Sequence, residues 1–113
     1  MSKEPVEYLK HIRDECSFIN SVMRTDLSKE DFLRDETLKR AVIRSLEIIG
    51  EATKKIPADF KYKWNSIKWK NMAGMRDRLI HDYMGVNYYI VWDVVKNKIP
   101  ELYDQIVDVI EKQ

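Results

Sequence analysis

The chain has little cysteine, glycine and proline, and it has no long apolar run. Its one cysteine, Cys16, excludes an internal disulfide framework and fits a reducing cytosol. Three glycines and three prolines in 113 residues disfavour a strand-rich fold with many turns. No apolar run approaches the roughly 20 residues that cross a bilayer, and the N-terminus lacks the apolar stretch of a secretory signal. We therefore expect a cytoplasmic protein that does not enter a membrane.

Neither acidic nor basic residues are in marked excess, and the formal net charge is only +1. The overall charge of the molecule therefore does not attract nucleic acid, and binding to nucleic acid would need a local patch of positive charge. Apolar residues make up 44% of the chain, which is enough to offset chain entropy and argues against disorder. The length suits one domain with one modest core, so we expect a single domain over residues 1–113.

Apolar residues recur at helical spacing through most of the chain. In the first segment they step by three, four, three and four from Leu9 to Met23, which is typical of a bundle seam. Long helices with short connections favour an all-α fold, a four- to five-helix up-and-down bundle. The predicted helices cover residues 4–24, 29–55, 69–84, 87–98 and 100 onward, with a loop over residues 57–68.

Single residues mark the expected helix ends. Ser28 can cap the second helix through its hydroxyl, and Pro57 ends that helix because proline cannot continue it. Gly85 suits the C-terminal cap of the third helix. Pro100 can open the fifth helix at its first position, where its missing N–H costs nothing.

Arg76, Asp77, His81 and Tyr83 gather on the predicted third helix. At about 100° per residue they occupy one broad arc at the edge of the apolar stripe. His81 can exchange a proton near neutral pH, and Asp77, four residues earlier, can hold the imidazole. Arg76 can bind phosphate, and Tyr83 offers a modifiable phenol. RNA supplies its own nucleophile, the 2′-hydroxyl, so a base and an anion stabiliser suffice to cleave it without a metal.

An exposed, salt-bridged helix surface would show the same spacing. Asp77–His81 and Arg78–Asp82 are both ordinary pairs of residues four apart. Spacing alone favours this structural interpretation over a catalytic site, and both stay open at this point.

The residues from Arg76 to Tyr83 resemble the Arg-x4-His-x-Tyr signature of HepT-like toxins in the HEPN superfamily. The segment LEIIGEA (46–52) is similar to the second-helix motif of that family, and WKNMAGMRDRLIHDYMGV (69–86) to its core block. Val91-Trp92 and Pro100-Glu101-Leu102 are similar to its downstream landmarks. The resemblance runs over residues 5–110.

The resemblance implies a HEPN helical domain that forms a homodimer, with both copies of the third helix lining one composite cleft. It implies a toxin of a toxin–antitoxin module, a metal-independent endoribonuclease that leaves a cyclic phosphate. Arg76 and His81 would be catalytic, and cleavage would need no cofactor. The partner would be a nucleotidyltransferase antitoxin that transfers AMP from ATP to Tyr83 and so silences the site.

Asp77 stands where the family typically has a polar residue, often Asn. A carboxylate can orient His81, but it also repels the phosphate of RNA. Both effects stay open.

The segment 54–70 is basic and rich in aromatic residues. Lysines interleaved with aromatic rings are typical of single-strand RNA binding, and Lys61, Lys63, Lys68 and Lys70 are the candidate contacts. A solvated loop whose aromatic side chains anchor it to the core explains the pattern slightly better, with Trp69 in the core. The segment carries Lys54, Lys55, Lys61, Lys63, Lys68 and Lys70 against one acid, Asp59, with Phe60, Tyr62, Trp64 and Trp69 between them.

Two other functions remain open. The chain could be a non-catalytic accessory subunit that regulates a nucleotidyltransferase, with Tyr83 as a substrate tyrosine. It could also be a plain dimeric bundle whose polar arc is solvated. A metal site is not expected, since His11 has no second histidine or cysteine at a ligand spacing.

Overall fold

The computed structural model describes residues 4–81 and 85–113, without the side chains of Arg76, Leu79, Ile80 and His81. The described residues are all-α, as predicted, and hold six helical segments, one more than the upper predicted number. The last segment is continuous from α6 through the π turn η1 to α7. The segments are α1 (Pro5–Val22), α2 (Lys29–Arg34), α3 (Glu36–Lys55), α4 (Ala58–Lys63), α5 (Trp69–His81), and α6 (Tyr88–Asp93) with η1 (Val94–Lys98) and α7 (Ile99–Glu111).

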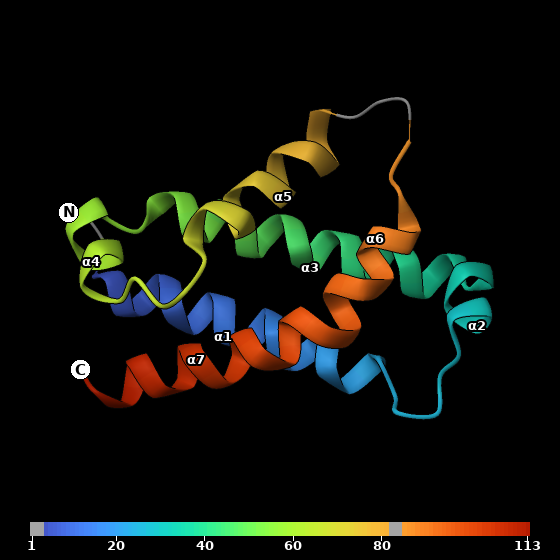
Figure 1. The fold of residues 1–113 in the computed structure, drawn as a ribbon, viewed down its shortest axis with the longest axis horizontal. Helices are drawn as coiled ribbons and strands as arrows, with labels where there is room; N and C mark the ends of the chain where they lie inside the picture. Colours follow the sequence, from blue (N-terminus) through green and yellow to red (C-terminus); the bar gives the residue numbers. More distant parts are fainter. Residues whose placement is uncertain (1–3, 82–84) are drawn as a thin grey trace.

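The long helices α1, α3, α5 and α7 lie roughly along one axis and alternate in direction (Figure 1). α3 is central, because it packs against α1 on one side and against α5 on the other. α1 also packs against α7. α5 is the outer helix and rises away from α7 toward its C-terminal end (Figure 1). Within the described part of the chain, no helix is long and apolar enough to span a membrane.

The predicted seam of the first helix forms the centre of the core. Leu9, Ile12, Cys16 and Ile19 are fully buried and Met23 is nearly so. They meet buried apolar residues of α3 and α7, with Ile106 fully enclosed. Each such side chain contributes about 1.5–3 kcal/mol on burial, so this spacing both forms the helix and fixes the face on which it packs.

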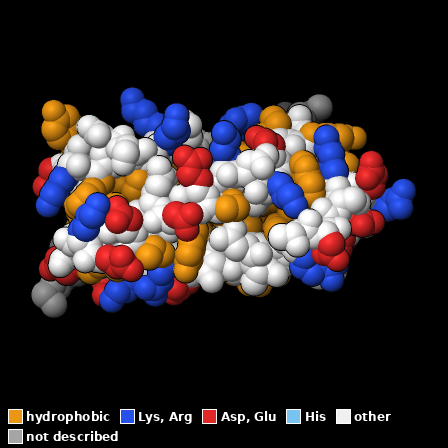
Figure 2. Space-filling view, turned by 60° about the horizontal axis from the view of Figure 1, so that its bottom comes forward, with side chains coloured by type: hydrophobic (Ala, Val, Ile, Leu, Met, Phe, Trp, Pro, Cys, Tyr) orange, Lys and Arg blue, Asp and Glu red, His pale blue; other side chains and the backbone are white. Residues whose placement is uncertain are grey.

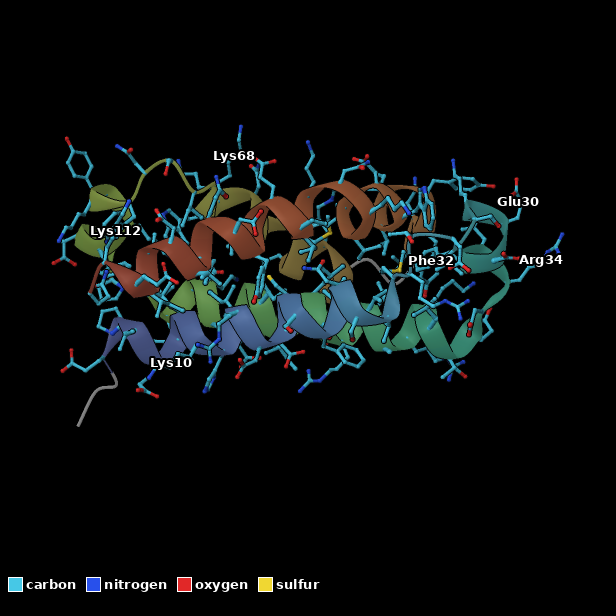
Figure 3. All side chains as sticks on the ribbon, turned by 90° about the horizontal axis from the view of Figure 1, so that it is seen from below. Lys10, Glu30, Phe32, Arg34, Lys68 and Lys112 are labelled. Atoms are coloured by element: carbon cyan, nitrogen blue, oxygen red, sulfur yellow. The ribbon has the colours of Figure 1, made fainter. Side chains whose placement is uncertain are left out.

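The predicted helix over residues 29–55 is wrong in one respect, because the chain bends at Asp35 and forms two helices. Asp35 is extended there (ψ 94°), and its carboxylate accepts a hydrogen bond from the Leu38 amide at 2.9 Å. Ser28 caps α2 as predicted, accepting from the Asp31 amide at 3.0 Å. The bend turns Phe32 inward, away from Glu30 and Arg34 (Figure 3). Phe32 is fully buried and lies 5.5 Å from the ring of Trp92.

The predicted loop over residues 57–68 is also wrong in part, because α4 forms within it. Pro57 ends α3 as expected and then precedes α4, where its carbonyl accepts from the Lys61 amide at 3.1 Å. Such a short helix carries no periodicity that a sequence pattern can show.

Pro100 does not open a separate helix. It is the second residue of α7, and the chain stays helical from Tyr88 to Glu111. A proline inside a helix removes one hydrogen bond and clashes with the carbonyl four residues earlier. The π turn η1 widens the helix just before it, with the Ile99 amide donating to the Val94 carbonyl, so the helix passes Pro100 without a break.

The third predicted helix ends at His81 within the described residues, and its predicted extension to Met84 lies outside them. Gly85 has φ 119°, a conformation that only glycine adopts readily.

We predict that Asp35→Ala lowers the free energy of unfolding by about 1 kcal/mol, because the first turn of α3 loses its cap. Urea denaturation measures this. Asp104→Ala, which removes an exposed carboxylate of α7, is the matched control and should change stability by less than about 0.5 kcal/mol. Equal losses for the two variants would show that the cap does not stabilise the bend.

Candidate active site

α5 is held in place at its N-terminal end. Trp69, the first residue of α5, is buried, and its indole N–H donates to the Trp64 carbonyl at 3.1 Å. Ile67 is buried just before it. From there α5 packs mainly along α3. The expected core position of Trp69 is confirmed, and it fixes where the rest of the helix lies.

The candidate catalytic residues follow along the same helix. Arg76 and His81 both lie in the backbone of α5, five residues apart. Their side chains lie outside the described part of the structure, and so does Tyr83. The structure therefore places the helix that carries the signature, and the roles of these three residues stay predictions.

Asp77 contacts a residue that the sequence did not connect with it. Its carboxylate accepts a hydrogen bond from the ammonium group of Lys54, near the end of α3. Both side chains are 43% exposed, so solvent screens the pair and it adds little to stability. The nearby positive charge does, however, offset part of the repulsion between Asp77 and a phosphate. The expected contact between Asp77 and His81 involves a side chain outside the described part of the chain and stays a prediction.

The candidate RNA-binding lysines lie in two different places. Lys61 and Lys63 are on α4. Lys61 is partly buried, which lowers the pKa of its amine below the usual value, and the Lys63 amine lies 5.4 Å from the centre of the Trp64 ring. Lys68 and Lys70 instead line a groove beside α5.

Aromatic side chains of the segment 54–70 behave mostly as anchors. Phe60 and Trp64 are partly buried against the core, with ring centres 6.5 Å apart. Tyr62 is the exception, with 81% of its surface exposed. The anchoring interpretation is confirmed for Phe60, Trp64 and Trp69, and it does not apply to Tyr62.

The groove runs between α5 and the η1–α7 segment and has a volume of about 610 Å³. Its floor includes Leu46 and Ile49 of α3. Arg78 and Lys98 line it together with Lys68 and Lys70. No sequence pattern groups Arg78 with Lys98, because only the tertiary packing brings the two helices together.

Charge elsewhere is mixed. Figure 2 shows Lys and Arg interspersed with Asp and Glu over the face that it presents, with apolar side chains between them. The net charge of +1 likewise shows no excess of either sign over the whole chain, so the cationic lining of the groove is a local feature.

Cys16 and His11 are two other reactive groups, and within the described part of the chain they do not form a second centre. Cys16 is fully enclosed, and burial raises the pKa of its thiol to about 12, so it is the small core residue that its seam position predicted. His11 is exposed on α1. Among the described residues, no three His, Cys, Asp or Glu side chains are grouped so that they could hold a metal ion.

Several known proteins that are similar to this chain are named as ribonucleases, which is the activity that the signature indicates. A protein of Caldanaerobacter subterraneus subsp. tengcongensis named "Putative RNase" is 48% identical over 111 residues, which is 98% of each chain. One of Methanocaldococcus jannaschii with the same name is 44% identical over 105 residues, 93% of this chain and 83% of that one. The "Probable ribonuclease HepT" of Thermococcus cleftensis is 46% identical over 102 residues, 90% of this chain and 92% of that one. Among solved structures, none matches significantly.

The family model described as "Ribonuclease HepT-like" matches residues 7–109. This range includes α5 and almost all of the helices that hold it. The resemblance carried by Arg76, His81 and Tyr83 is thereby confirmed at the level of the family, and the chain belongs to the HepT-like ribonucleases.

Proposed function

We propose that this protein is a metal-independent endoribonuclease, the toxin of a cytoplasmic toxin–antitoxin module. The observation that carries the proposal is the Arg76-x4-His81-x-Tyr83 signature in a chain of the HepT-like ribonuclease family, with Arg76 and His81 in the backbone of α5. α5 is an outer helix packed on one neighbour, which leaves room for a substrate as long as an RNA strand.

The proposed reaction is attack by the substrate on its own backbone. His81 takes the proton from a 2′-hydroxyl, whose oxygen then bonds to the adjacent phosphorus. Arg76 stabilises the extra negative charge on the phosphorane. The bond to the 5′-oxygen breaks, that oxygen takes up a proton, and a 2′,3′-cyclic phosphate remains. No metal is needed, because RNA itself supplies the nucleophile.

A second copy of the chain would complete this chemistry. The reaction needs a base for the 2′-hydroxyl and an acid for the leaving oxygen. The sequence has one other histidine that could act as the acid, His11, and it lies on α1. α1 packs against α3 and α7 rather than against α5. In a homodimer with the two α5 helices facing one cleft, one His81 acts as base and the other as acid.

Asp77 and the lysines would support the site. Asp77 orients the imidazole of His81, while Lys54 balances the charge of its carboxylate. Lys61, Lys63, Lys68 and Lys70 are the proposed RNA contacts, the first two from α4 and the last two from the groove.

Silencing would act on Tyr83. A nucleotidyltransferase antitoxin transfers AMP from ATP to its phenol, which forms a phosphodiester and releases pyrophosphate. The added nucleotide brings bulk and a negative phosphate to the place where RNA phosphate must bind, so the site is both blocked and repulsive to RNA.

We predict that His81→Ala lowers the rate of RNA cleavage at least about 100-fold, as loss of acid–base help does. Expression without any partner should arrest growth and produce new RNA ends for the wild type alone. His11→Ala, which removes the exposed histidine of α1, is the matched control and should stay toxic. If wild type and His81→Ala are both harmless at equal soluble levels, the chain is a non-catalytic accessory subunit of a nucleotidyltransferase instead.

We predict that Tyr83→Phe escapes modification, because the acceptor hydroxyl is gone. Incubation with the nucleotidyltransferase and ATP should add the mass of AMP to the wild type and not to this variant. Tyr62→Phe, at an exposed tyrosine of α4, should be modified like the wild type. AMP on Tyr83→Phe would place the acceptor elsewhere.

We predict that Lys54→Gln slows cleavage about two- to fivefold, because the variant removes the positive charge of Lys54 beside the Asp77 carboxylate; the effect is small because both side chains are 43% exposed. The double variant Lys54→Gln/Asp77→Asn should regain part of the lost rate. Cleavage assays at low and high salt measure the coupling, which salt should weaken. Additive effects of the two substitutions would separate the ion pair from the reaction.

A further inference from the structure

The groove beside α5 is lined by charges of mostly one sign. Lys68, Lys70, Arg78 and Lys98 stand against one acid, Glu101, among its described lining residues, and all five side chains are exposed. Lys70 and Arg78 belong to α5, Lys68 directly precedes it, and Lys98 belongs to η1, so both helical segments that flank the groove contribute positive charge. An anionic occupant is therefore favoured over a neutral or cationic one.

The floor of the same groove is apolar. Leu46 and Ile49 of α3 and Ile99 of α7 form its base, and the partly exposed side chains of Met72 and Met75 line α5. Methionine adapts its shape and contacts flat rings favourably. An apolar floor under a cationic rim suits a ligand that has flat rings on a negatively charged backbone.

Gly74 gives an independent indication of where such a ligand approaches. It lies in the middle of α5 and lines the groove, and a Cβ built there meets no described atom within 4 Å. Glycine inside a helix is less stable than alanine, and no described neighbour requires it here. A ligand that comes close to the α5 backbone would require it.

Two occupants compete on these grounds. A second copy of the chain brings the same four cations and does not supply the negative charge that the rim of the groove favours. A single strand of RNA brings phosphates for the rim and bases for the floor. The volume of about 610 Å³ lies within the range usual for small-ligand sites, which fits a nucleotide unit.

We propose that this groove is a subsite for single-stranded RNA, in which one base lies against Met72 and Met75 and the neighbouring phosphates contact Lys68, Lys70, Arg78 and Lys98. The groove follows α5 as far as Arg78, so a strand bound there continues toward the segment that carries Arg76 and His81. The choice of RNA rests on the proposed function, whereas the preference for an anionic ligand with flat rings rests on the groove.

The test is binding of a short, fluorescein-labelled 2′-O-methyl RNA, which lacks the nucleophile and is not cut. Lys98→Ala and Lys68→Ala should each weaken binding and lower the slope of log K against log salt by about 0.7 for each phosphate that the variant no longer neutralises. Lys10→Ala is the matched control, since Lys10 and Lys68 project from opposite sides of the molecule (Figure 3). It should leave the affinity and the slope unchanged.

Gly74→Ala separates binding from folding. It should raise Tm by about 4 °C, because alanine favours the helix, and still weaken binding, because the new methyl group occupies the place of the ligand. A variant that is more stable but binds less RNA cannot be explained by unfolding.

The remaining outcomes are distinct. Unchanged RNA affinity in Lys98→Ala, Lys68→Ala and Gly74→Ala overturns the subsite. The subsite is also overturned if these variants keep their affinity for RNA but no longer self-associate in sedimentation experiments. That result would make the groove a subunit interface. If wild type binds this RNA through the groove but never cleaves a 2′-hydroxyl RNA, the subsite stands and the proposed function fails.

Discussion

The packing of α3 against two neighbours is the constraint on which the rest of the structure depends. α3 contacts α1 through one side and α5 through another, and Val42, Leu46 and Ile49 are buried on it. α5 makes its main contact with α3 alone, so its position follows from that surface and from Trp69 at its start. A helix held mainly on one side and at one end leaves described side chains such as Lys70, Asn71 and Arg78 exposed, and a site for a polymer needs accessible side chains of this kind.

The α5 helix joins structure to the proposed chemistry. It carries Arg76 and His81 in its backbone, presents Asp77 to Lys54 of α3, and lines the groove with Met72 and Arg78. Asp77 would be a poor neighbour for RNA if it stood alone. Its pairing with Lys54 shows how a carboxylate can stand next to a proposed anion-binding arginine without an unbalanced negative charge. In the proposed reaction, the cationic groove beside α5 adds electrostatic attraction for the RNA backbone.

Much of this fold could be predicted from the sequence, because burial at helical spacing is a local signal. The seam from Leu9 to Met23, the cap at Ser28 and the stop at Pro57 all follow from single residues and their neighbours. The bend at Asp35 was missed because apolar spacing continues across it, although aspartate is itself a good capping residue. The continuous helix through Pro100 was not predicted, because no sequence signal indicates the π turn that relieves the usual clash between proline and the preceding helical turn.

The site could be predicted only where its members stand close together in the sequence. Arg76, His81 and Tyr83 stand within eight positions and form a recognisable signature. Lys54 and Asp77 are 23 residues apart, and Lys98 and Lys68 line one groove only because the helices around them pack on either side of it. Such contacts depend on how helices pack, and one sequence without its fold does not specify them.

The most direct measurement is the chemistry of the RNA ends that the purified protein makes in the presence of EDTA. The account predicts cleavage that the chelator does not reduce, with a 2′,3′-cyclic phosphate on one fragment and a 5′-hydroxyl on the other. Cleavage that EDTA abolishes would show that the reaction needs a metal, and fragments that carry a 3′-hydroxyl and a 5′-phosphate would show that water attacks the phosphorus. Either result would contradict the account.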